Sequence, residues 1–201
     1  MKKIFILAVT GALLSGCNDD DETFQVERRN DDYQPNTVGS TWTYSSFFDF
    51  TQTVTGGGKT IDGKKYFEYK ITIEGLSSFK TYARKDGNTY INREIFSGQY
   101  DDGEYIFLKD APEGTYWTEL SYDEDGVETS DLLFIVETNE TVTVGSETFN
   151  NVIIVEVSSL TEGNTEPYIL YHYYAKGVGL IRIADDFGFA NTDLASYSIK
   201  N

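Results

Sequence analysis

The sequence predicts an all-β domain, an antiparallel meander that forms a sandwich or a partly open barrel. Residues 66–74 alternate between apolar and polar side chains, which is the period of a half-buried strand. Turn signals that contain glycine recur along the chain, whereas stretches with helical periodicity are nearly absent. Tyr, Phe and Trp make up 15% of the residues, and these types favour strands. We expect a single all-β domain over residues 38–201.

The expected strands are separated by short turns. Asp86-Gly87 is the clearest hairpin signal, because strand-like segments at 79–84 and 88–96 flank it. Further turns are expected at Gly56-Gly57-Gly58, Asp62-Gly63, Asp102-Gly103, Glu113-Gly114, Asp125-Gly126 and Glu162-Gly163. Two segments, Leu132–Val136 and Val152–Val155, are continuously apolar. This pattern predicts strands that are covered on both faces, at the centre of a sandwich or barrel.

Short sequence echoes suggest an internal repeat. They pair 39–43 with 114–118, 63–67 with 145–149, and 82–84 with 174–176. The offset grows along the chain, so the loops of the two copies would differ in length. The echoes indicate either two related halves of one domain or a coincidence between strands rich in Gly and Tyr.

The amino terminus has the pattern of a secretory signal. Two lysines precede the apolar residues 4–14, which are too few to span a bilayer core that needs about twenty. Leu14, Ser15, Gly16 and Cys17 follow, and this string resembles the lipobox of bacterial lipoproteins. The resemblance implies that residues 1–16 are removed and that Cys17 carries diacylglycerol and a further acyl chain such as palmitate. Membrane partnership would then be through covalent lipid.

Residues 17–37 are polar and begin with an acidic run, Asn18-Asp19-Asp20-Asp21-Glu22. Such a composition predicts a flexible tether. The acidic run resembles the surface-export signal of lipoproteins from Bacteroidetes-type bacteria, which implies an outer-membrane protein exposed at the cell surface. A plain soluble spacer on the periplasmic face is the alternative. Cys17 is the only cysteine, so we expect a domain without disulfides.

Charge and composition restrict the function. The net charge of −17 disfavours nucleic acid as a partner. One histidine, no Gly-x-Ser-x-Gly motif and a cysteine assigned to lipid leave few residues for catalysis, so an enzyme is the less favoured class. Asp123-Glu124-Asp125-Gly126 lacks the spacing of a calcium loop, and Asp185-Asp186 is interpreted as a loop pair. We expect neither a metal nor a cofactor.

The densest aromatic segment is 168–174. On a strand, Tyr168, His172 and Tyr174 face one side, whereas Tyr171 and Tyr173 face the other. Such a row, with Trp42 and Trp117, could stack a sugar or another small ligand. The alternative interpretation is ordinary packing between strands, with the hydroxyl groups at the surface.

Two further strings resemble uncharacterised lipoproteins of Bacteroidetes-type bacteria. Residues 173–180 match a Tyr-Tyr-Ala-x-Gly-Val-Gly-Leu strand near the end of those domains, and 39–44 is similar to their first strand. The resemblance implies a β-sandwich or partial barrel without a known activity. Lipocalin barrels carry Gly-x-Trp on the first strand. The spacing here, Gly39-x-x-Trp42, is one residue longer, which limits that likeness to architecture.

Together these observations predict a lipid-anchored envelope protein that acts as a non-catalytic binding or structural module, with a glycan or envelope protein as partner. The alternatives are a binder of carbohydrate or another small ligand, and a hydrolase that uses two of the 33 acidic residues. The sequence does not specify the oligomeric state.

Overall fold

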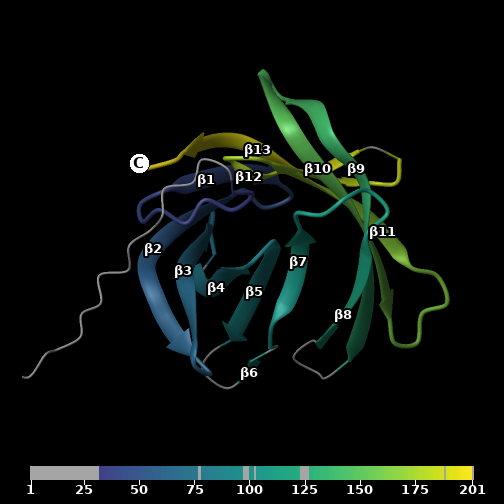
Figure 1. Cartoon of the computed structure of the whole chain (residues 1–201), viewed down its shortest axis with the longest axis horizontal. Helices are drawn as coiled ribbons and strands as arrows, with labels where there is room; N and C mark the ends of the chain where they lie inside the picture. Colours follow the sequence, from purple (N-terminus) through teal and green to yellow (C-terminus); the bar gives the residue numbers. More distant parts are fainter. Residues whose placement is uncertain are drawn as a thin grey trace, which may run out of the picture.

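The computed structural model describes residues 32–76, 78–96, 100–101, 103–122, 127–187 and 189–200. The lipobox residues and the acidic string 123–126 therefore lie outside the described residues. All regular elements within the described part are strands (Figure 1). They are β1 (Thr41–Ser46), β2 (Phe50–Ile61), β3 (Lys64–Ile73), β4 (Ser78–Asp86), β5 (Thr89–Phe96), β6 (Tyr100–Asp101), β7 (Tyr105–Lys109), β8 (Tyr116–Tyr122), β9 (Glu128–Val144), β10 (Glu147–Thr161), β11 (Tyr168–Ala175), β12 (Gly179–Asp185) and β13 (Ala190–Ser198).

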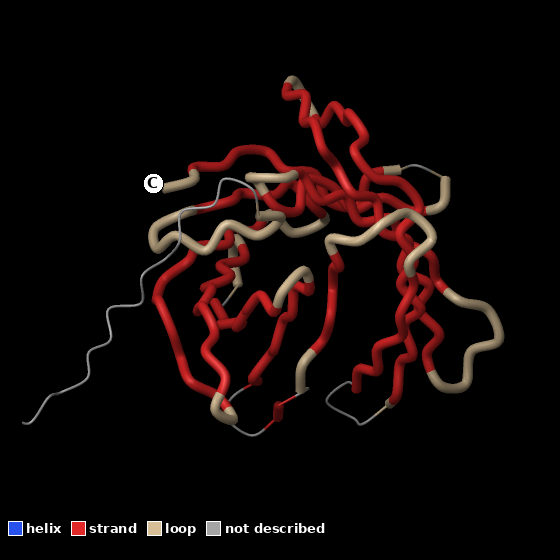
Figure 2. Tube along the Cα trace, in the orientation of Figure 1, coloured by secondary structure: helices blue, strands red, loops and turns tan. Residues whose placement is uncertain are grey.

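The strands form one antiparallel sheet in the order β6-β5-β4-β3-β2-β1-β13-β12-β11-β10-β9-β8, and β7 also pairs with β5. Most neighbours in the sheet are neighbours in the chain, as in a meander. Apart from the pairing of β5 with β7, the exception is the ladder between β1 and β13, which begins with Thr41 opposite Ser198 and joins the two ends of the domain. The sheet curls until β7 and β8 face each other (Figures 1 and 2). The predicted all-β meander is confirmed, in the form of a nearly closed barrel.

Side chains of β8 close the barrel where the described residues show no ladder between β7 and β8. The indole Nε1 of Trp117 donates a hydrogen bond to the carbonyl oxygen of Ile106, at 2.8 Å. The backbone N–H of Ile106 donates to the carboxylate of Glu119. Both backbone groups of Ile106 are thus satisfied by side chains in place of a neighbouring strand.

The segment before β1 packs against one end of the barrel. Tyr33 is only 4% exposed, and its backbone N–H donates to the hydroxyl of Tyr90 at 3.2 Å. The carbonyl of Asp32 accepts from Gly177 at 2.8 Å, and the hydroxyl of Tyr69 donates to Asn36. Residues 32–37, which the sequence predicts as part of the tether, therefore pack against the barrel in the structure. The composition of this stretch is polar on average, but it includes Tyr33, whose ring has a large apolar surface that is buried on folding.

Most of the predicted turns that the structure describes lie between strands. Asp62 and Gly63, between β2 and β3, both have positive φ, which a tight hairpin turn requires. Glu162-Gly163 likewise separates two strands, and Gly87 begins the turn that follows Asp86, the last residue of β4. The turn predicted at Gly56-Gly57-Gly58 is wrong, because these residues lie inside β2. The register against β3 shifts twice here, and glycine accommodates such irregular pairing without a side-chain clash.

The two apolar runs differ in burial. Val152–Val155 on β10 is buried throughout, as predicted. On β9, Leu133 and Ile135 are buried, but Leu132 and Phe134 remain 45% and 36% exposed. The prediction that Leu132–Val136 is covered on both faces is therefore wrong. Only the edge strand β8 lies beyond β9 in the sheet, and no strand of the described residues forms a further layer over the outer face at these two positions.

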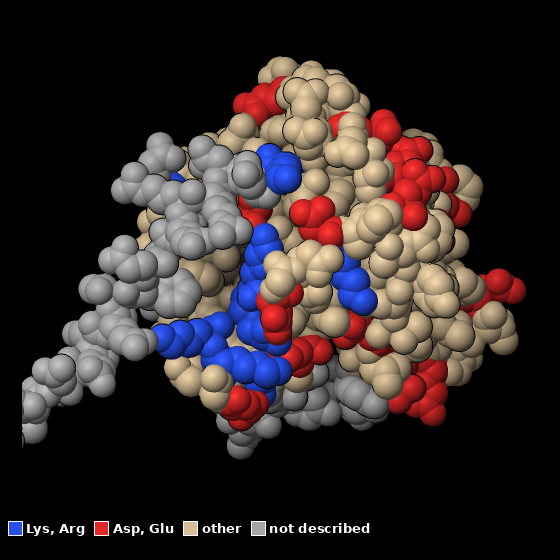
Figure 3. All heavy atoms as spheres, viewed as in Figure 1, with Lys and Arg blue, Asp and Glu red and all other residues tan. Residues whose placement is uncertain are grey.

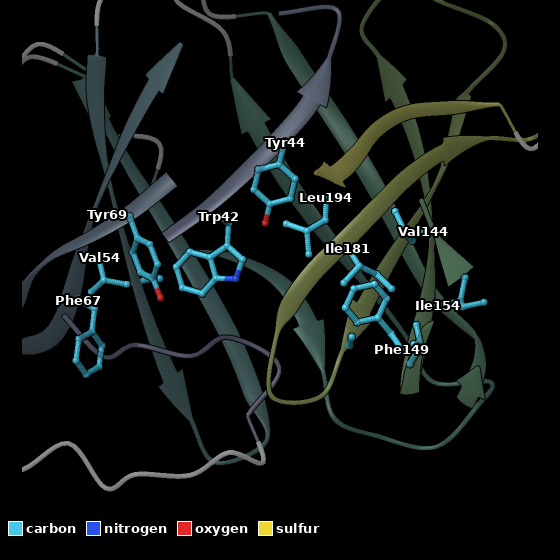
Figure 4. Close-up of a cluster of buried hydrophobic side chains, with 13 residues drawn as sticks. Trp42, Tyr44, Val54, Phe67, Tyr69, Val144, Phe149, Ile154, Ile181 and Leu194 are labelled. Atoms are coloured by element: carbon cyan, nitrogen blue, oxygen red, sulfur yellow. The ribbon is translucent and has the colours of Figure 1, made fainter. Parts of the chain in front are cut away.

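Long hairpins extend the core. The end of the β9–β10 hairpin projects beyond the other strands (Figure 1). Its Phe149 contacts the ring of Tyr197 on β13 at a centroid distance of 6.2 Å. Figure 4 shows one cluster with Trp42 and Tyr69 at one side, Val144 and Phe149 at the other, and residues of β12 and β13 between them. The hairpin therefore adds apolar contacts that the barrel wall alone does not supply.

The echoed strings fall on strands in the same order. Trp42 and Trp117 are the second residues of β1 and β8, and the second pair of strings begins in the turns of the β2–β3 and β9–β10 hairpins. The third pair lies within β4 and at the end of β11. Duplication of a half-domain stays a prediction, and this placement is compatible with it.

Candidate functional site

A cavity of about 370 Å³ lies inside the barrel beside the junction of β7 and β8. Its volume falls in the range of small-molecule sites, roughly 300–1,000 Å³. Residues of β5, β7, β8, β9, β11 and β12 line it, together with the residues before β7. They are Asn92, Gly103, Tyr105, Phe107, Leu120, Ser121, Leu133, His172, Tyr174, Leu180 and Ile183.

The alternation of β11 divides the predicted aromatic row between two sides of the barrel wall. His172 and Tyr174 line the cavity. Tyr171 points to the other face, where its hydroxyl donates to the carboxylate of Glu156 at 3.2 Å. Tyr168 is 58% exposed. The structure thus brings two members of the predicted set to the cavity and leaves Tyr168, Tyr171 and Tyr173 out of its lining.

The two tryptophans have different positions. Trp42 lines a second, smaller cavity of about 100 Å³ below the segment 32–40, and its Nε1 donates to the carbonyl of Val178 at 2.7 Å. The two cavities share Asn92, Phe107, Tyr174 and Leu180. Trp117 lines neither of them. It instead closes the junction of β7 and β8, where the ammonium of Lys109 lies 5.0 Å from the indole ring.

A buried acid lies behind the cavity wall. The hydroxyl of Tyr105 donates to Oδ2 of Asp131 at 2.7 Å, and Asp131 is only 6% exposed. Its Oδ1 has no hydrogen-bond partner among the described residues. An unsatisfied buried acceptor costs about 1–3 kcal/mol, so this oxygen is a position where an additional donor would stabilise the protein.

The surroundings of Asp131 are electronegative. Glu119 lies directly opposite it in the β8–β9 ladder. Burial raises the pKa of Glu119 and the charge of Asp131 adds to this effect, although the bond from Ile106 and the charge of Lys109 act in the opposite direction. Burial also raises the pKa of Tyr105 above its usual range, and the bond to Asp131 contributes further. Neither carboxylate belongs to the cavity lining, so the arrangement is not that of two acids converging on a substrate.

His172 is neutral at pH 7. Burial lowers the pKa of His172 to about 4, although the negative charge of Asp131 acts in the opposite direction. Its Nδ1 lies 3.4 Å from the hydroxyl of Tyr174, which is a long hydrogen bond at best. The described residues of the cavity lining therefore supply polar groups without a charged side chain.

The outer surface carries paired charges. Figure 3 shows Lys and Arg side chains next to acidic ones on the face that includes β3 and β4. Glu104 accepts from Lys64 at 2.6 Å and from Arg84 at 2.7 Å, and the hydroxyl of Tyr66 also donates to it. The guanidinium of Arg84 in particular lowers the pKa of Glu104 to about 2. Glu104 thus connects β3 and β4 to the segment before β7, and its negative charge is paired with the positive charges of Lys64 and Arg84.

The described residues form no metal site. No group of three or more His, Cys, Asp or Glu side chains among them could hold a metal ion. Asp185 instead organises its own loop, because its carboxylate accepts from the backbone N–H groups of Phe187 and Phe189. The described part of the chain also contains no helix that is long and apolar enough to cross a membrane.

Several cavity residues were not identified from the sequence, among them Asn92, Tyr105, Phe107 and the underlying Asp131. A signal existed for three of them. Tyr105 and Phe107 are two positions apart on a short strand, so they share a face. Asp131 immediately precedes the apolar run of β9, where a carboxylate at the start of a buried strand is unusual. Nothing in the local sequence distinguishes Asn92.

Comparison with known proteins supports the fold. No family model matches the chain, and no curated protein matches it. Among solved structures, the chain is similar to that of a putative lipoprotein from Parabacteroides distasonis, with a TM-score of 0.52 and 14% sequence identity. The similarity covers 85% of this chain and 100% of that one. At this identity the likeness shows a shared barrel architecture.

Proposed function

We propose that this chain is a lipid-anchored protein of the bacterial cell envelope and that its barrel binds a small molecule in the cavity between β7, β8 and β11. The cavity itself is the observation that carries the binding role. It combines apolar walls, such as Phe107 and Leu133, with uncharged polar groups from Tyr105 and His172. Ligand sites have this composition, in which a few polar groups orient an otherwise apolar contact.

The lipobox string 14–17 supports the anchor, and the similar barrel described as a lipoprotein is compatible with it. The acidic run after Cys17 favours the outer membrane and the cell surface. Replacing Cys17 by serine should abolish labelling with radioactive palmitate and release the protein from the membrane fraction. Labelling that persists in the C17S chain would contradict the anchor. Protease digestion of intact cells would test surface exposure separately.

The binding role is testable on the full C17S chain purified without lipid. Native mass spectrometry would reveal a retained molecule, and a thermal-shift panel of sugars, amines, alcohols and carboxylates would identify a binding class. Leu133 is buried against the cavity, whereas its neighbour Leu132 is exposed. Leu133→Phe should therefore weaken the binding of any ligand found, and Leu132→Phe should not. Equal affinity in both variants, with both folded by circular dichroism, would rule out this cavity.

A further inference from the structure

The direction of one hydrogen bond determines what Tyr105 offers to a ligand. A carboxylate can only accept hydrogen bonds, so the hydroxyl proton of Tyr105 is directed to Oδ2 of Asp131. Tyr105 lines the cavity, and its oxygen retains only lone pairs for other contacts. A ligand that contacts this oxygen must therefore be the donor.

The charges around the cavity favour the same kind of ligand. Asp131 is buried directly behind Tyr105, and Glu119 lies opposite Asp131 on the neighbouring strand. No lysine or arginine is among the described residues that line the cavity. Lys109 offsets part of the charge of Glu119, but the structure shows no cation beside Asp131 among the described residues. An anionic ligand would therefore be repelled by Asp131, whereas a cation would be attracted by it.

The walls suit an organic cation better than a bare ion. The rings of Phe107 and Tyr174 lie 5.6 Å apart and both line the cavity. Aromatic faces attract ammonium groups, and they also bury apolar carbon. Leu133 and Ile183 supply further apolar surface.

We infer that the cavity selects a small organic amine, with its ammonium group directed to the Tyr105 hydroxyl and the Asp131 carboxylate and its apolar body against the aromatic and aliphatic walls. This inference rests on the proposed binding function and specifies its ligand class. Oδ1 of Asp131 has no hydrogen-bond partner among the described residues, so the bond from Tyr105 is the one hydrogen bond to this carboxylate that they show. Its charge would attract the ammonium group from behind Tyr105.

Three probes with one shared aromatic body separate the alternatives: 2-phenylethylamine, 2-phenylethanol and phenylacetate. Isothermal titration on the full C17S chain at pH 7 should give the amine an affinity at least about tenfold above that of the alcohol, and the carboxylate the weakest binding. Asp131→Asn should remove most of this preference. The matched variant Glu137→Gln, on the exposed face of the same strand, should retain it.

Tyr105→Phe tests the inference independently if the Asp131 variant does not fold. It removes the acceptor oxygen, so the affinity for the amine should fall several-fold while binding of the alcohol, which can lose only one neutral hydrogen bond, changes less. Phenylacetate binding as tightly as the amine, or an amine preference unchanged in both variants, would overturn the inference and leave the binding function intact. Absence of binding by all three probes, together with no retained molecule, would contradict the binding function itself.

Discussion

Trp117 on β8 donates its indole N–H to the carbonyl oxygen of Ile106 on β7 at 2.8 Å, and this bond joins the two strands at which the barrel would otherwise stand open. Glu119, two residues further along β8, accepts the N–H of the same isoleucine. The side chains of Trp117 and Glu119 thus make the hydrogen bonds to β7 that a neighbouring strand's backbone makes elsewhere in the sheet. Because the cavity lies beside this junction, the junction controls how well the cavity wall holds its shape.

Replacing Trp117 by phenylalanine should lower the free energy of unfolding by about 1–3 kcal/mol, since the carbonyl of Ile106 loses its donor. Amide exchange should also accelerate in β7, which can be measured by mass spectrometry. Trp42→Phe is the matched control, because it removes the corresponding bond to Val178 at the other cavity. Faster exchange in β7 in both variants to the same extent would contradict a specific role of Trp117.

The segment 32–37 should contribute to the stability of the barrel. Tyr33 is buried, and its ring meets that of Tyr90 edge-on at 6.2 Å. Tyr33→Ala should therefore cost about 3 kcal/mol, as for other large aromatic truncations. Val38→Ala, at a position that is 48% exposed, should cost little. Urea denaturation of the two variants measures the difference. Equal midpoints would show that this segment does not stabilise the barrel.

His172 should make stability depend on pH between about 6.5 and 4. Burial lowers the pKa of His172 from 6.5 to about 4, so the folded protein binds fewer protons than the unfolded chain in this window. The resulting stabilisation is complete above pH 6.5 and is lost as the pH falls toward 4, by up to about 3 kcal/mol. His172→Gln should flatten the stability curve in this range. Parallel curves for the variant and the natural chain would refute this assignment.

The fold was more predictable than the cavity, for a physical reason. Alternation at 66–74 and the glycine turn at 86–87 report local backbone geometry, and both fall where expected. The cavity instead depends on which distant strands meet after the sheet has curled. Tyr105 and Asp131 are 26 residues apart, and local periodicity contains no information on their contact.

The boundary of the domain illustrates the same point on a smaller scale. Composition averaged over 17–37 indicates a tether, but one buried side chain, Tyr33, attaches the last residues of that stretch to the barrel.

The aromatic row 168–174 could be predicted from the sequence only in part. Its alternation correctly separates His172 and Tyr174 from Tyr171 and Tyr173, yet only the closed barrel determines which side faces the cavity.

Glu104 should confer a second pH dependence in a lower range. Its contacts with Arg84, Lys64 and Tyr66 lower its pKa from 4.5 to about 2. The unfolded chain therefore takes up this proton first as the pH falls. The stabilisation is complete above about pH 4.5 and is lost toward pH 2. Because the Glu104 side chain is 26% exposed, solvent screens the pair, and Glu104→Gln should cost only about 1 kcal/mol at pH 7.

The difference between the natural chain and Glu104→Gln should shrink as the pH falls below 4.5, and chemical denaturation at a series of pH values would measure it. Glu113→Gln, at an exposed position in the loop before β8, is the matched control and should leave stability unchanged at every pH.

Salt distinguishes the pH effect of Glu104 from that of His172. Added salt should weaken the Glu104 contribution, which is partly exposed, and should leave that of His172 nearly unchanged, because burial of an uncharged imidazole does not depend on an ion pair. A Glu104 difference that persisted unchanged down to pH 2 would show that packing, and not charge, accounts for its effect.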